Sequence, residues 1–304
     1  MKITALHPNH SLRIRLEQMG RDAIALTKPK VISLLLLTTF AAMFITPAGL
    51  PHWQTVFWTM IGGYLMAGGA NAVNMAYDSD IDSIMGRTSK RPVPSGRVSK
   101  NTAYAFGFML MALSFIILAT LVNGLTAALA FIGFIYYTVI YTAWLKRRTS
   151  QNIVIGGGAG AIPPLVGFAA ASGSLDITAA LLFVIIFMWT PPHFWALALM
   201  MRMRKDYGSV GVPMLPVVAT EAETTRQIWI YSWVMLAITL ILVAIGAMGW
   251  IYMTVAIVIG ALFLLRAWQL KKDCTQKRAL ELYKYSLLYL ALLFVGMAAD
   301  RMIL

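Results

Sequence analysis

Nine apolar stretches constrain the fold of this chain more than any other feature of its sequence. A helix that crosses the hydrocarbon core of a bilayer needs about 20 predominantly apolar residues, and lipid offers its backbone no hydrogen-bond partners. Stretches of about that length lie at 23–46, 53–77, 102–121, 125–145, 153–172, 177–200, 227–247, 250–268 and 281–300. They predict an all-α polytopic membrane protein with nine transmembrane helices.

The segment before the first stretch is expected to stay outside the hydrocarbon core. Arg13, Arg15 and Arg21 interrupt any apolar run there, so this segment does not have the pattern of a signal peptide. We expect residues 1–22 to form a cytoplasmic or interfacial amino-terminal segment. Residues 23–304 are then a single transmembrane domain.

The basic residues fall almost entirely on one side of the predicted helices. The net charge of +13 is compatible with nucleic-acid binding, so the positions of the 25 Lys and Arg residues decide the matter. All but Arg301 fall into groups of six, five, three, four and six, around the start of the first stretch and after the second, fourth, sixth and eighth. By the positive-inside rule the amino terminus and these loops are cytoplasmic and the carboxyl terminus is outside. The charge therefore reports topology, with Lys28 as one of the membrane anchors, and needs no nucleic-acid partner.

A cluster of polar residues ends the second stretch. Asn74, Asp78 and Asp82 are spaced four residues apart, so on a helix an amide and two carboxylates project from one stripe and can share a cation. Three basic residues follow them: Arg87, Lys90 and Arg91. An anion bridged to carboxylates by a divalent metal needs that combination of groups. The cluster therefore predicts a metal-diphosphate site.

The same cluster has a simpler interpretation. Carboxylates at the cytoplasmic end of a transmembrane helix can form a solvated cap, and the basic residues after them can be topology signals. The strict register beside a long apolar run favours the metal-diphosphate site. Asp80 lies roughly 200° around a helix from Asp78, so it is expected to point elsewhere, as a solvated acid or one behind the ligands.

Two features in the middle of the chain have both a structural and a functional interpretation. Lys146 and Arg147 lie in the loop after the fourth stretch, where they either signal topology or contact phosphate. The glycine-rich run 156–161 lies inside an apolar stretch and does not follow a strand. This position favours close helix packing over a phosphate-binding loop.

The sixth stretch contains a proline pair at membrane depth. Pro191 and Pro192 are expected to break the helix, and the freed backbone groups must line a cavity or find partners on neighbouring helices. His193 follows the pair, with Trp189 and Trp195 on either side. A lone histidine is often a satisfied core residue, whereas one beside a broken membrane helix is a candidate for substrate binding. Both interpretations stay open.

A second acid follows the sixth stretch, on the same side of the membrane as the first cluster. Asp206, flanked by Lys205 and Tyr207, comes four helices after Asp82. This spacing suggests two four-helix units plus a ninth helix, arranged around a central cavity, with both units offering acids to one site. The last three helices have no comparable cluster and are expected to be scaffold.

These motifs resemble those of a known family. The pattern Asn74-x-x-x-Asp78-x-x-x-Asp82 resembles the first signature of the UbiA-type intramembrane prenyltransferases. Further segments are similar to the branch of protohaem IX farnesyltransferases: Arg87-Thr, Arg91-Pro, Trp189-Thr-Pro-Pro-His-Phe-Trp, Lys205-Asp-Tyr and Gly211-Val-Pro-Met-Leu-Pro. The resemblance spans roughly residues 22 to 300.

The resemblance implies an activity, a metal and a location. It implies transfer of a farnesyl group from farnesyl diphosphate to a vinyl group of haem b, with addition of water, giving haem O for haem-copper oxidases. It implies Mg²⁺ bridging the diphosphate, the bacterial inner membrane as location, and association with haem A synthase or oxidase assembly factors. The catalytic and metal-binding residues would be Asn74, Asp78, Asp82 and Asp206. The substrate-binding residues would be Arg87, Lys90, Arg91, Lys146, Arg147, His193, Lys205 and Tyr207.

One position departs from the pattern of the superfamily. Many members have a second acidic pair four residues apart, but here Arg202 stands four residues before Asp206. The departure removes one metal ligand, fits the haem branch and leaves the number of metal ions open. Two alternative functions remain: a quinone-pathway prenyltransferase with an aromatic acid or phenol as acceptor, and a cation-coupled transporter with acids along an ion path.

Overall fold

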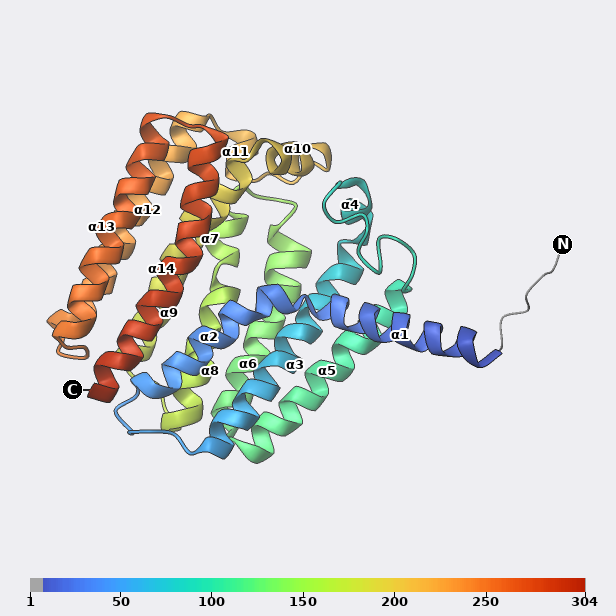
Figure 1. The fold of residues 1–304 in the computed structure, drawn as a ribbon, viewed down its shortest axis with the longest axis horizontal. Helices are drawn as coiled ribbons and strands as arrows, with labels where there is room; N and C mark the ends of the chain where they lie inside the picture. The colour runs from blue at the N-terminus through green and yellow to red at the C-terminus, as the bar shows by residue number, and fades with distance from the viewer. Residues whose placement is uncertain (1–7, 304) are drawn as a thin grey trace.

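Regular structure is entirely helical throughout residues 8–303, the part of the chain that the computed structural model describes, with side chains from Arg15 onward except that of Arg202 (Figure 1). The elements are α1 (Pro8–Thr27), α2 (Pro29–Ile45), α3 (Trp53–Tyr77), α4 (Ser79–Ile84), α5 (Lys100–Leu121), α6 (Gly124–Ile135), the π-helix η1 (Tyr136–Leu145), α7 (Asn152–Gly156), α8 (Gly158–Ser172), α9 (Ile177–Leu199), α10 (Met201–Ser209), α11 (Leu215–Val218), α12 (Glu221–Ala244), α13 (Trp250–Lys272) and α14 (Gln276–Ile303). The all-α prediction is confirmed. Residues 1–7 of the expected amino-terminal segment lie outside the described residues.

Polar residues in the loops start several of the long helices. Side chains at four cap positions each accept a hydrogen bond from the backbone N–H three residues later: Ser99, Asn123, Asp176 and Thr220. Such caps satisfy donors that have no partner in the first helical turn. The residue at which α5, α6, α9 or α12 starts is therefore set by a local cap, whereas the apolar stretch predicts only that a helix is present.

Seven helical segments in the described range are long and apolar enough to cross a membrane. They are Lys100–Leu121, Gly124–Leu145, Asn152–Ser172, Ile177–Leu199, Glu221–Ala244, Trp250–Lys272 and Gln276–Ile303. An eighth results if α1 and α2, bent by 50° at their junction, count as one span. The 25-residue helix α3 coincides with the predicted stretch 53–77, but it is not among these segments. Its sequence contains several glycine and asparagine residues between the apolar ones. The chain is a polytopic membrane protein, and the number of nine spans stays a prediction.

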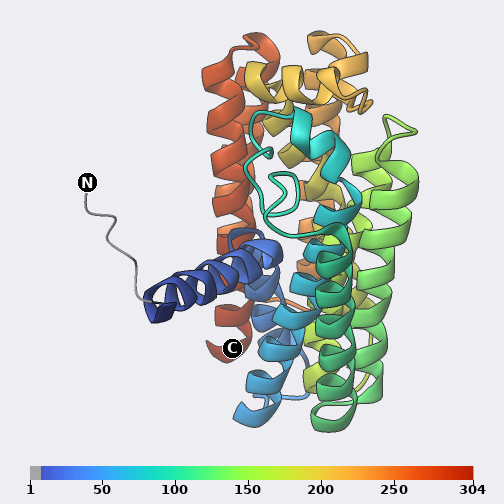
Figure 2. The same cartoon turned by 90° about the vertical axis from the view of Figure 1, so that its right-hand side faces the viewer.

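The long helices form a bundle in which neighbours along the chain pack side by side (Figures 1 and 2). Contacts run from α2 through α3, α5, α6, α8, α9, α12 and α13 to α14, and α14 packs back against α2. α2 also packs on α8, and α14 on α9, so these four helices join the two halves of the chain. At the α2–α8 contact, Gly167 lies against the backbone carbonyl of Thr39, where a side chain would not fit.

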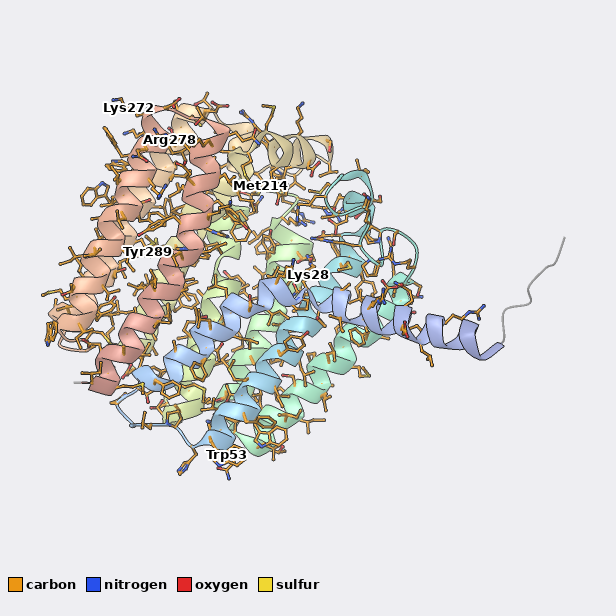
Figure 3. All side chains as sticks on the ribbon, viewed as in Figure 1. Lys28, Trp53, Met214, Lys272, Arg278 and Tyr289 are labelled. Atoms are coloured by element: carbon orange, nitrogen blue, oxygen red, sulfur yellow. The ribbon has the colours of Figure 1, made fainter. Side chains whose placement is uncertain are left out.

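The two ends of the bundle differ in charge. Lys272 and Arg278 lie at the same end as α4, α10 and Met214, whereas Trp53 and the carboxyl terminus lie at the opposite end (Figure 3). The basic loop at Lys272 and Arg278 therefore lies at the end that carries both acidic motifs, whereas Lys28 lies near the middle of the bundle's height (Figure 3). For that loop the position agrees with the alternation of charge along the sequence.

The chain turns sharply at Lys28, between α1 and α2. Lys28 has φ 55° and ψ 61°, in the left-handed region that residues with a side chain rarely adopt, and Pro29 then starts α2. Arg97 Nε lies 3.0 Å from Asp22 Oδ1, which ties α1 to the loop after α4. The predicted first span is therefore divided at Lys28, and its first residues belong to α1.

α9 passes through its proline pair without a break, so that expectation is wrong. Both Pro191 and Pro192 lie inside the helix. Prolines remove hydrogen bonds from the helix, but close packing supports the backbone here. A Cβ on Gly157 would lie 2.9 Å from Cβ of Thr190, and Trp195 is fully buried. The glycine-rich run is thereby confirmed as a packing surface.

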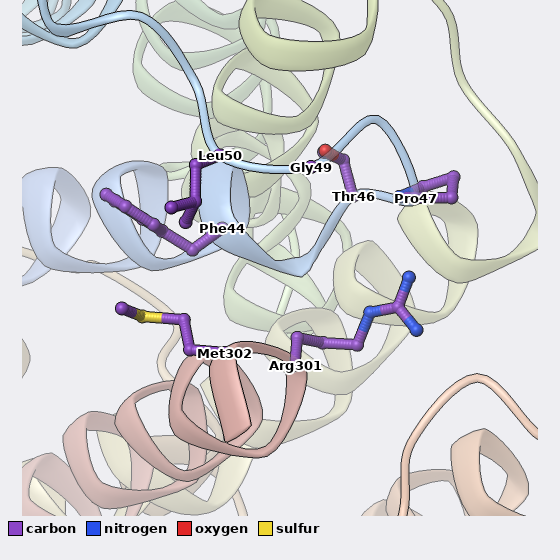
Figure 4. A pocket seen from close by; sticks show the side chains of 7 residues that line it. All are labelled: Phe44, Thr46, Pro47, Gly49, Leu50, Arg301 and Met302. Atoms are coloured by element: carbon purple, nitrogen blue, oxygen red, sulfur yellow. The ribbon is translucent and has the colours of Figure 1, made fainter. Parts of the chain in front are cut away.

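Two adjoining pockets lie at the end of the bundle opposite α4. The first has a volume of about 210 Å³ and is lined by Phe44, Thr46, Pro47, Gly49, Leu50, Arg301 and Met302 (Figure 4). The second, of about 270 Å³, shares Pro47 and Arg301 with it. Neither pocket includes a residue of the predicted site, so the central cavity stays a prediction.

Candidate active site

The predicted acid register is formed across the junction of α3 and α4. Asp78 lies between the two helices, and its N–H donates to the Asn74 carbonyl at 2.9 Å. The Asp82 N–H donates in turn to the Asp78 carbonyl at 2.8 Å. The side-chain Nδ2 of Asn74 donates to Asp78 Oδ2 at 2.8 Å, and all three side chains are buried. Helical spacing thus continues through the junction and places an amide and two carboxylates inside the protein.

Two cations from the loop after η1 contact Asp78. Lys146 Nζ lies 2.5 Å from Asp78 Oδ2, and Arg147 Nη2 lies 3.4 Å from Oδ1. The Asp78 side chain is 1% exposed and that of Lys146 is 14% exposed, so water screens this ion pair weakly. Sequence reasoning left a topology role and a site role open for these residues, and both of them lie beside the first acid of the motif.

Asp80 lies outside this buried group but shares a cation with it. Its side chain is 53% exposed, and the Arg147 guanidinium donates to both of its oxygens, at 2.7 and 2.8 Å. These charged hydrogen bonds lower the pKa of Asp80 from 3.8 to about 2. The guanidinium also lies 5.3 Å from the centre of the Tyr77 ring, within range of a cation–π contact. The different directions expected for Asp78 and Asp80 are confirmed, and Arg147 connects the two.

Asp82 pairs with a basic residue of the loop that follows α4. Arg91 Nη1 lies 2.6 Å from Asp82 Oδ2, and Thr88 Oγ1 donates to the Asp82 carbonyl at 2.9 Å. Arg87 and Lys90 are exposed, and neither forms an ion pair with another described residue. Of the three cations predicted beside the acids, Arg91 is thus the one that contacts them.

Sequence reasoning missed the role of Lys28 and the shape of η1. Lys28 Nζ donates to Asn74 Oδ1 at 2.7 Å, although its position before a membrane helix suggested an anchor. Thr142 of η1 accepts from Asn74 Nδ2 at 2.9 Å and donates to the Tyr137 carbonyl, five residues earlier, at 2.8 Å. Both the oxygen and the nitrogen of the Asn74 side-chain amide are therefore hydrogen-bonded. A π-helix is wider than an α-helix, occurs often at functional sites, and has no local sequence signal.

The second acid lies at the same end of the bundle, on α10 (Figures 1 and 2). Asp206 is half-buried, and its Oδ2 is a buried atom that has no hydrogen-bond partner in the described structure. The adjacent Tyr207 packs on an apolar cluster that includes Ile81 of α4, whereas Lys205 is exposed. The cluster thus links the two acidic motifs, which are far apart in the sequence.

The oxygen atoms at this end of the bundle are of the type that binds a hard divalent cation. Mg²⁺ prefers carboxylate and amide oxygens, which Asn74, Asp78 and Asp82 supply. The unpartnered Oδ2 of Asp206 is a further acceptor at the same end. Across the residues described, no three His, Cys, Asp or Glu side chains already form a group that could hold a metal. The oxygens are thus of the type that Mg²⁺ prefers, but in this conformation Lys146 and Arg91 contact the carboxylates.

His193 lies inside the bundle, between α9 and α14. Its Nδ1 is 2.6 Å from Ser286 Oγ, and Trp189 Nε1 donates to the Ser286 carbonyl at 2.8 Å. The rings of Trp189 and Tyr283 have their centres 4.3 and 4.9 Å from that of the imidazole. α14 thus supplies polar and aromatic partners of His193, while the expectation that the last three helices are scaffold stays a prediction.

Comparison with known proteins gives close relatives over most of the chain. The model of the UbiA prenyltransferase family matches residues 35–293. A protoheme IX farnesyltransferase of Chloroflexus aurantiacus is 61% identical over 283 residues, which make up 93% of this chain and 48% of the relative. Another, of Trichodesmium erythraeum, is 48% identical over 299 residues, or 97% of this chain and 90% of the relative. The chain thus spans about half the length of the first relative and most of the second.

Solved structures share the fold. A structure of digeranylgeranylglyceryl phosphate synthase aligns with a TM-score of 0.77 at 16% identity, over 94% of this chain and 100% of that one. A UbiA homologue from Archaeoglobus fulgidus, bound to GPP and Mg²⁺, aligns with a TM-score of 0.67 at 16% identity, over 91% and 99%. At such identities the likeness establishes the fold alone. Together with the family model and the close relatives, it leads to one assignment: the chain belongs to the UbiA prenyltransferase family.

Proposed function

We propose that this chain transfers a farnesyl group from farnesyl diphosphate to a vinyl group of haem b, giving haem O and diphosphate. The observation that carries the donor half is the buried register of Asn74, Asp78 and Asp82, which four basic side chains surround: Lys28, Arg91, Lys146 and Arg147. Oxygen ligands and cations at one place are what a metal-bound diphosphate needs. The relatives named protoheme IX farnesyltransferase support haem b as the acceptor.

The residues of the site can stabilise the charge that develops on the leaving group. In the proposed reaction the allylic carbon–oxygen bond breaks with its electron pair on the diphosphate, and a carbon–carbon bond forms to the vinyl group. Water adds to the remaining carbocation and releases a proton. Mg²⁺, when bound, would neutralise part of the diphosphate charge. Lys146 and Arg91, held near the carboxylates, supply fixed positive charge where the anion develops.

The acceptor is proposed to meet the protein at His193, deeper in the bundle. Imidazole can coordinate haem iron or donate to a propionate. Trp189, Tyr283 and Phe194 surround it with ring centres 4.3, 4.9 and 5.0 Å away. Aromatic faces also stabilise the allylic carbocation of the farnesyl group and exclude water from it until the carbon–carbon bond has formed.

The proposed topology has nine spans, as two four-helix units plus one helix around a central cavity, in the bacterial inner membrane. The amino terminus would be cytoplasmic and the carboxyl terminus outside, because all but one of the 25 Lys and Arg residues fall in the amino-terminal segment and the loops on its side of the membrane. Reporter fusions after Asn123 and Ser174 should report the outside, and fusions after Ser95 and Lys272 the cytoplasm. Cytoplasmic signals at the first pair would overturn this orientation. Association with haem A synthase or oxidase assembly factors stays a prediction.

The activity is tested with purified protein, haem b, farnesyl diphosphate and Mg²⁺, with the product identified by mass. The expected product is haem b plus one farnesyl group and one hydroxyl group, together with diphosphate. A parallel reaction that replaces haem b with an aromatic acid or phenol tests the quinone-pathway alternative. A prenylated product only in that second reaction would overturn the haem assignment, and no diphosphate release in either would leave the transporter as the alternative.

A further inference from the structure

The contacts of His193 determine which of its ring nitrogens carries the proton. Ser286 Oγ lies 2.7 Å from the Tyr283 carbonyl and 2.6 Å from His193 Nδ1. A carbonyl oxygen can only accept, so the single hydroxyl proton of Ser286 is used in that bond. The hydroxyl oxygen then accepts from His193, and Nδ1 must be the protonated nitrogen. The lone pair of the neutral imidazole is therefore on Nε2.

Nε2 is left available by this arrangement. In the described structure His193 has no hydrogen bond other than the one to Ser286, and the residue is 6% exposed. Its ring is held in orientation from both helices. Trp189 stacks on it and is itself fixed by its hydrogen bond to the Ser286 carbonyl, while Tyr283 approaches from α14. A neutral imidazole fixed through Nδ1–H, with a free Nε2, has the form that binds haem iron.

We propose that Ser286 is a positioning residue for the acceptor: it holds His193 in the Nδ1–H tautomer so that Nε2 coordinates the iron of the haem substrate. The inference rests on the proposed function and deepens it, because it chooses iron over a propionate as the partner of His193. It also gives α14 a direct part in acceptor binding. Partners that fix a metal-binding histidine in this way commonly change metal affinity 10- to 100-fold when removed.

The test is a spectroscopic titration of purified protein with ferric haem b. The wild-type protein should give the absorption and electron paramagnetic resonance spectra of histidine-ligated haem. His193→Gly should lose them, and added imidazole should restore them. Ser286→Ala should weaken haem binding about tenfold or more and shift the Soret band, because the ring can rotate or change tautomer. Ser286→Thr, which keeps the hydroxyl, should recover most of the affinity. Farnesyl diphosphate affinity, titrated separately, should stay unchanged in all variants.

Ser232→Ala is the matched control, because Ser232 is also a buried serine on a membrane helix, with its hydroxyl bonded to the Ile228 carbonyl at 2.6 Å. It should leave the haem spectrum and affinity unchanged. If Ser286→Ala lowers the thermal midpoint more than this control does, Ser286→Cys, which has nearly the same volume and accepts a hydrogen bond only weakly, replaces it.

The outcomes separate this inference from the proposed function. Wild-type spectrum and haem affinity in Ser286→Ala, or in Ser286→Cys where it replaces that variant, would overturn the positioning role, and a histidine-ligated spectrum in His193→Gly would overturn iron coordination. Either result can accompany normal formation of haem O by the wild-type protein, in which case the proposed function stands. If the wild-type protein forms no haem O, the proposed function fails, while the titration still decides on ligation.

Discussion

The two acidic motifs lie at the same end of the bundle but differ in how their charge is balanced. Asp78 and Asp82 are buried, and each has a cation within 2.6 Å. Asp206 is half-buried, and one of its oxygens has no partner among the described residues. Removing one partner of a pair in the first motif would therefore leave a buried charge without its counter-charge. The second motif has an unsatisfied buried acceptor, which costs stability.

The largest effect is expected for Asp78→Asn and Asp82→Asn. Each removes a carboxylate from the predicted metal-diphosphate site, and turnover should fall 10²-fold or more, as when a preorganised charge at a leaving group is lost. Asp78→Asn also leaves the weakly exposed Lys146 without its anion, which typically costs about 3–5 kcal/mol for a buried pair. Turnover and thermal midpoint should thus fall together, although the variants should remain folded in the membrane.

Asp176→Asn is the control for these variants. Asp176 caps α9 at the opposite end of the bundle, and asparagine is as good a cap as aspartate. It should change neither turnover nor the thermal midpoint. Equal losses of turnover at Asp78, Asp82 and Asp80 would contradict a registered site and indicate a diffuse acidic cap.

Asp206→Ala should separate activity from stability. Removing the carboxylate takes away one ligand or charge of the site, so turnover should fall by up to about 10²-fold. The thermal midpoint should stay the same or rise, because the variant no longer buries an unpartnered oxygen. A fall in midpoint similar to that of Asp78→Asn would show that Asp206 is paired in the protein and would remove the contrast between the motifs.

Lys28→Met tests the cation that sequence reasoning overlooked. Methionine keeps the length of the side chain but loses the donor to Asn74 Oδ1 at 2.7 Å. Hydrogen bonds that involve a charged group contribute about 1.5–3 kcal/mol, so a loss of about tenfold or more in turnover is expected. Lys30→Met, at an exposed lysine two residues later, is the matched control. Equal small effects of the two variants would return Lys28 to the role of a membrane anchor.

The sequence predicts features that depend on neighbours along the chain. The bounds of α3 and the register from Asn74 to Asp82 follow from apolar length and a spacing of four residues. The hydrogen bond from Asn74 to Asp78 could be foreseen because both lie on one helical stripe.

Features that depend on packing between distant segments could not be predicted in this way. Lys28 and Asn74 are 46 residues apart, and His193 and Ser286 are 93 residues apart, so no local pattern connects them. The π-helix η1 has no local sequence signal, and α9 continues through two buried prolines that were expected to break it. These features depend on parts of the molecule that no local pattern shows.

The smallest effect is expected for Asp80→Ala. This variant tests whether the contact of Arg147 with the buried Asp78 or with the exposed Asp80 matters for turnover. Asp80 is half-exposed, and exposed ion pairs contribute at most about 1 kcal/mol, so turnover should stay within about fivefold of the wild type. The pKa of Asp80 is lowered from 3.8 to about 2, so the pair stabilises the protein above about pH 4 and loses this effect as the pH falls through about 2. Between pH 5 and 9 the difference in thermal midpoint between Asp80→Ala and the wild type should therefore be constant. A difference that varies across that range would show that Arg147 acts mainly through another titrating group.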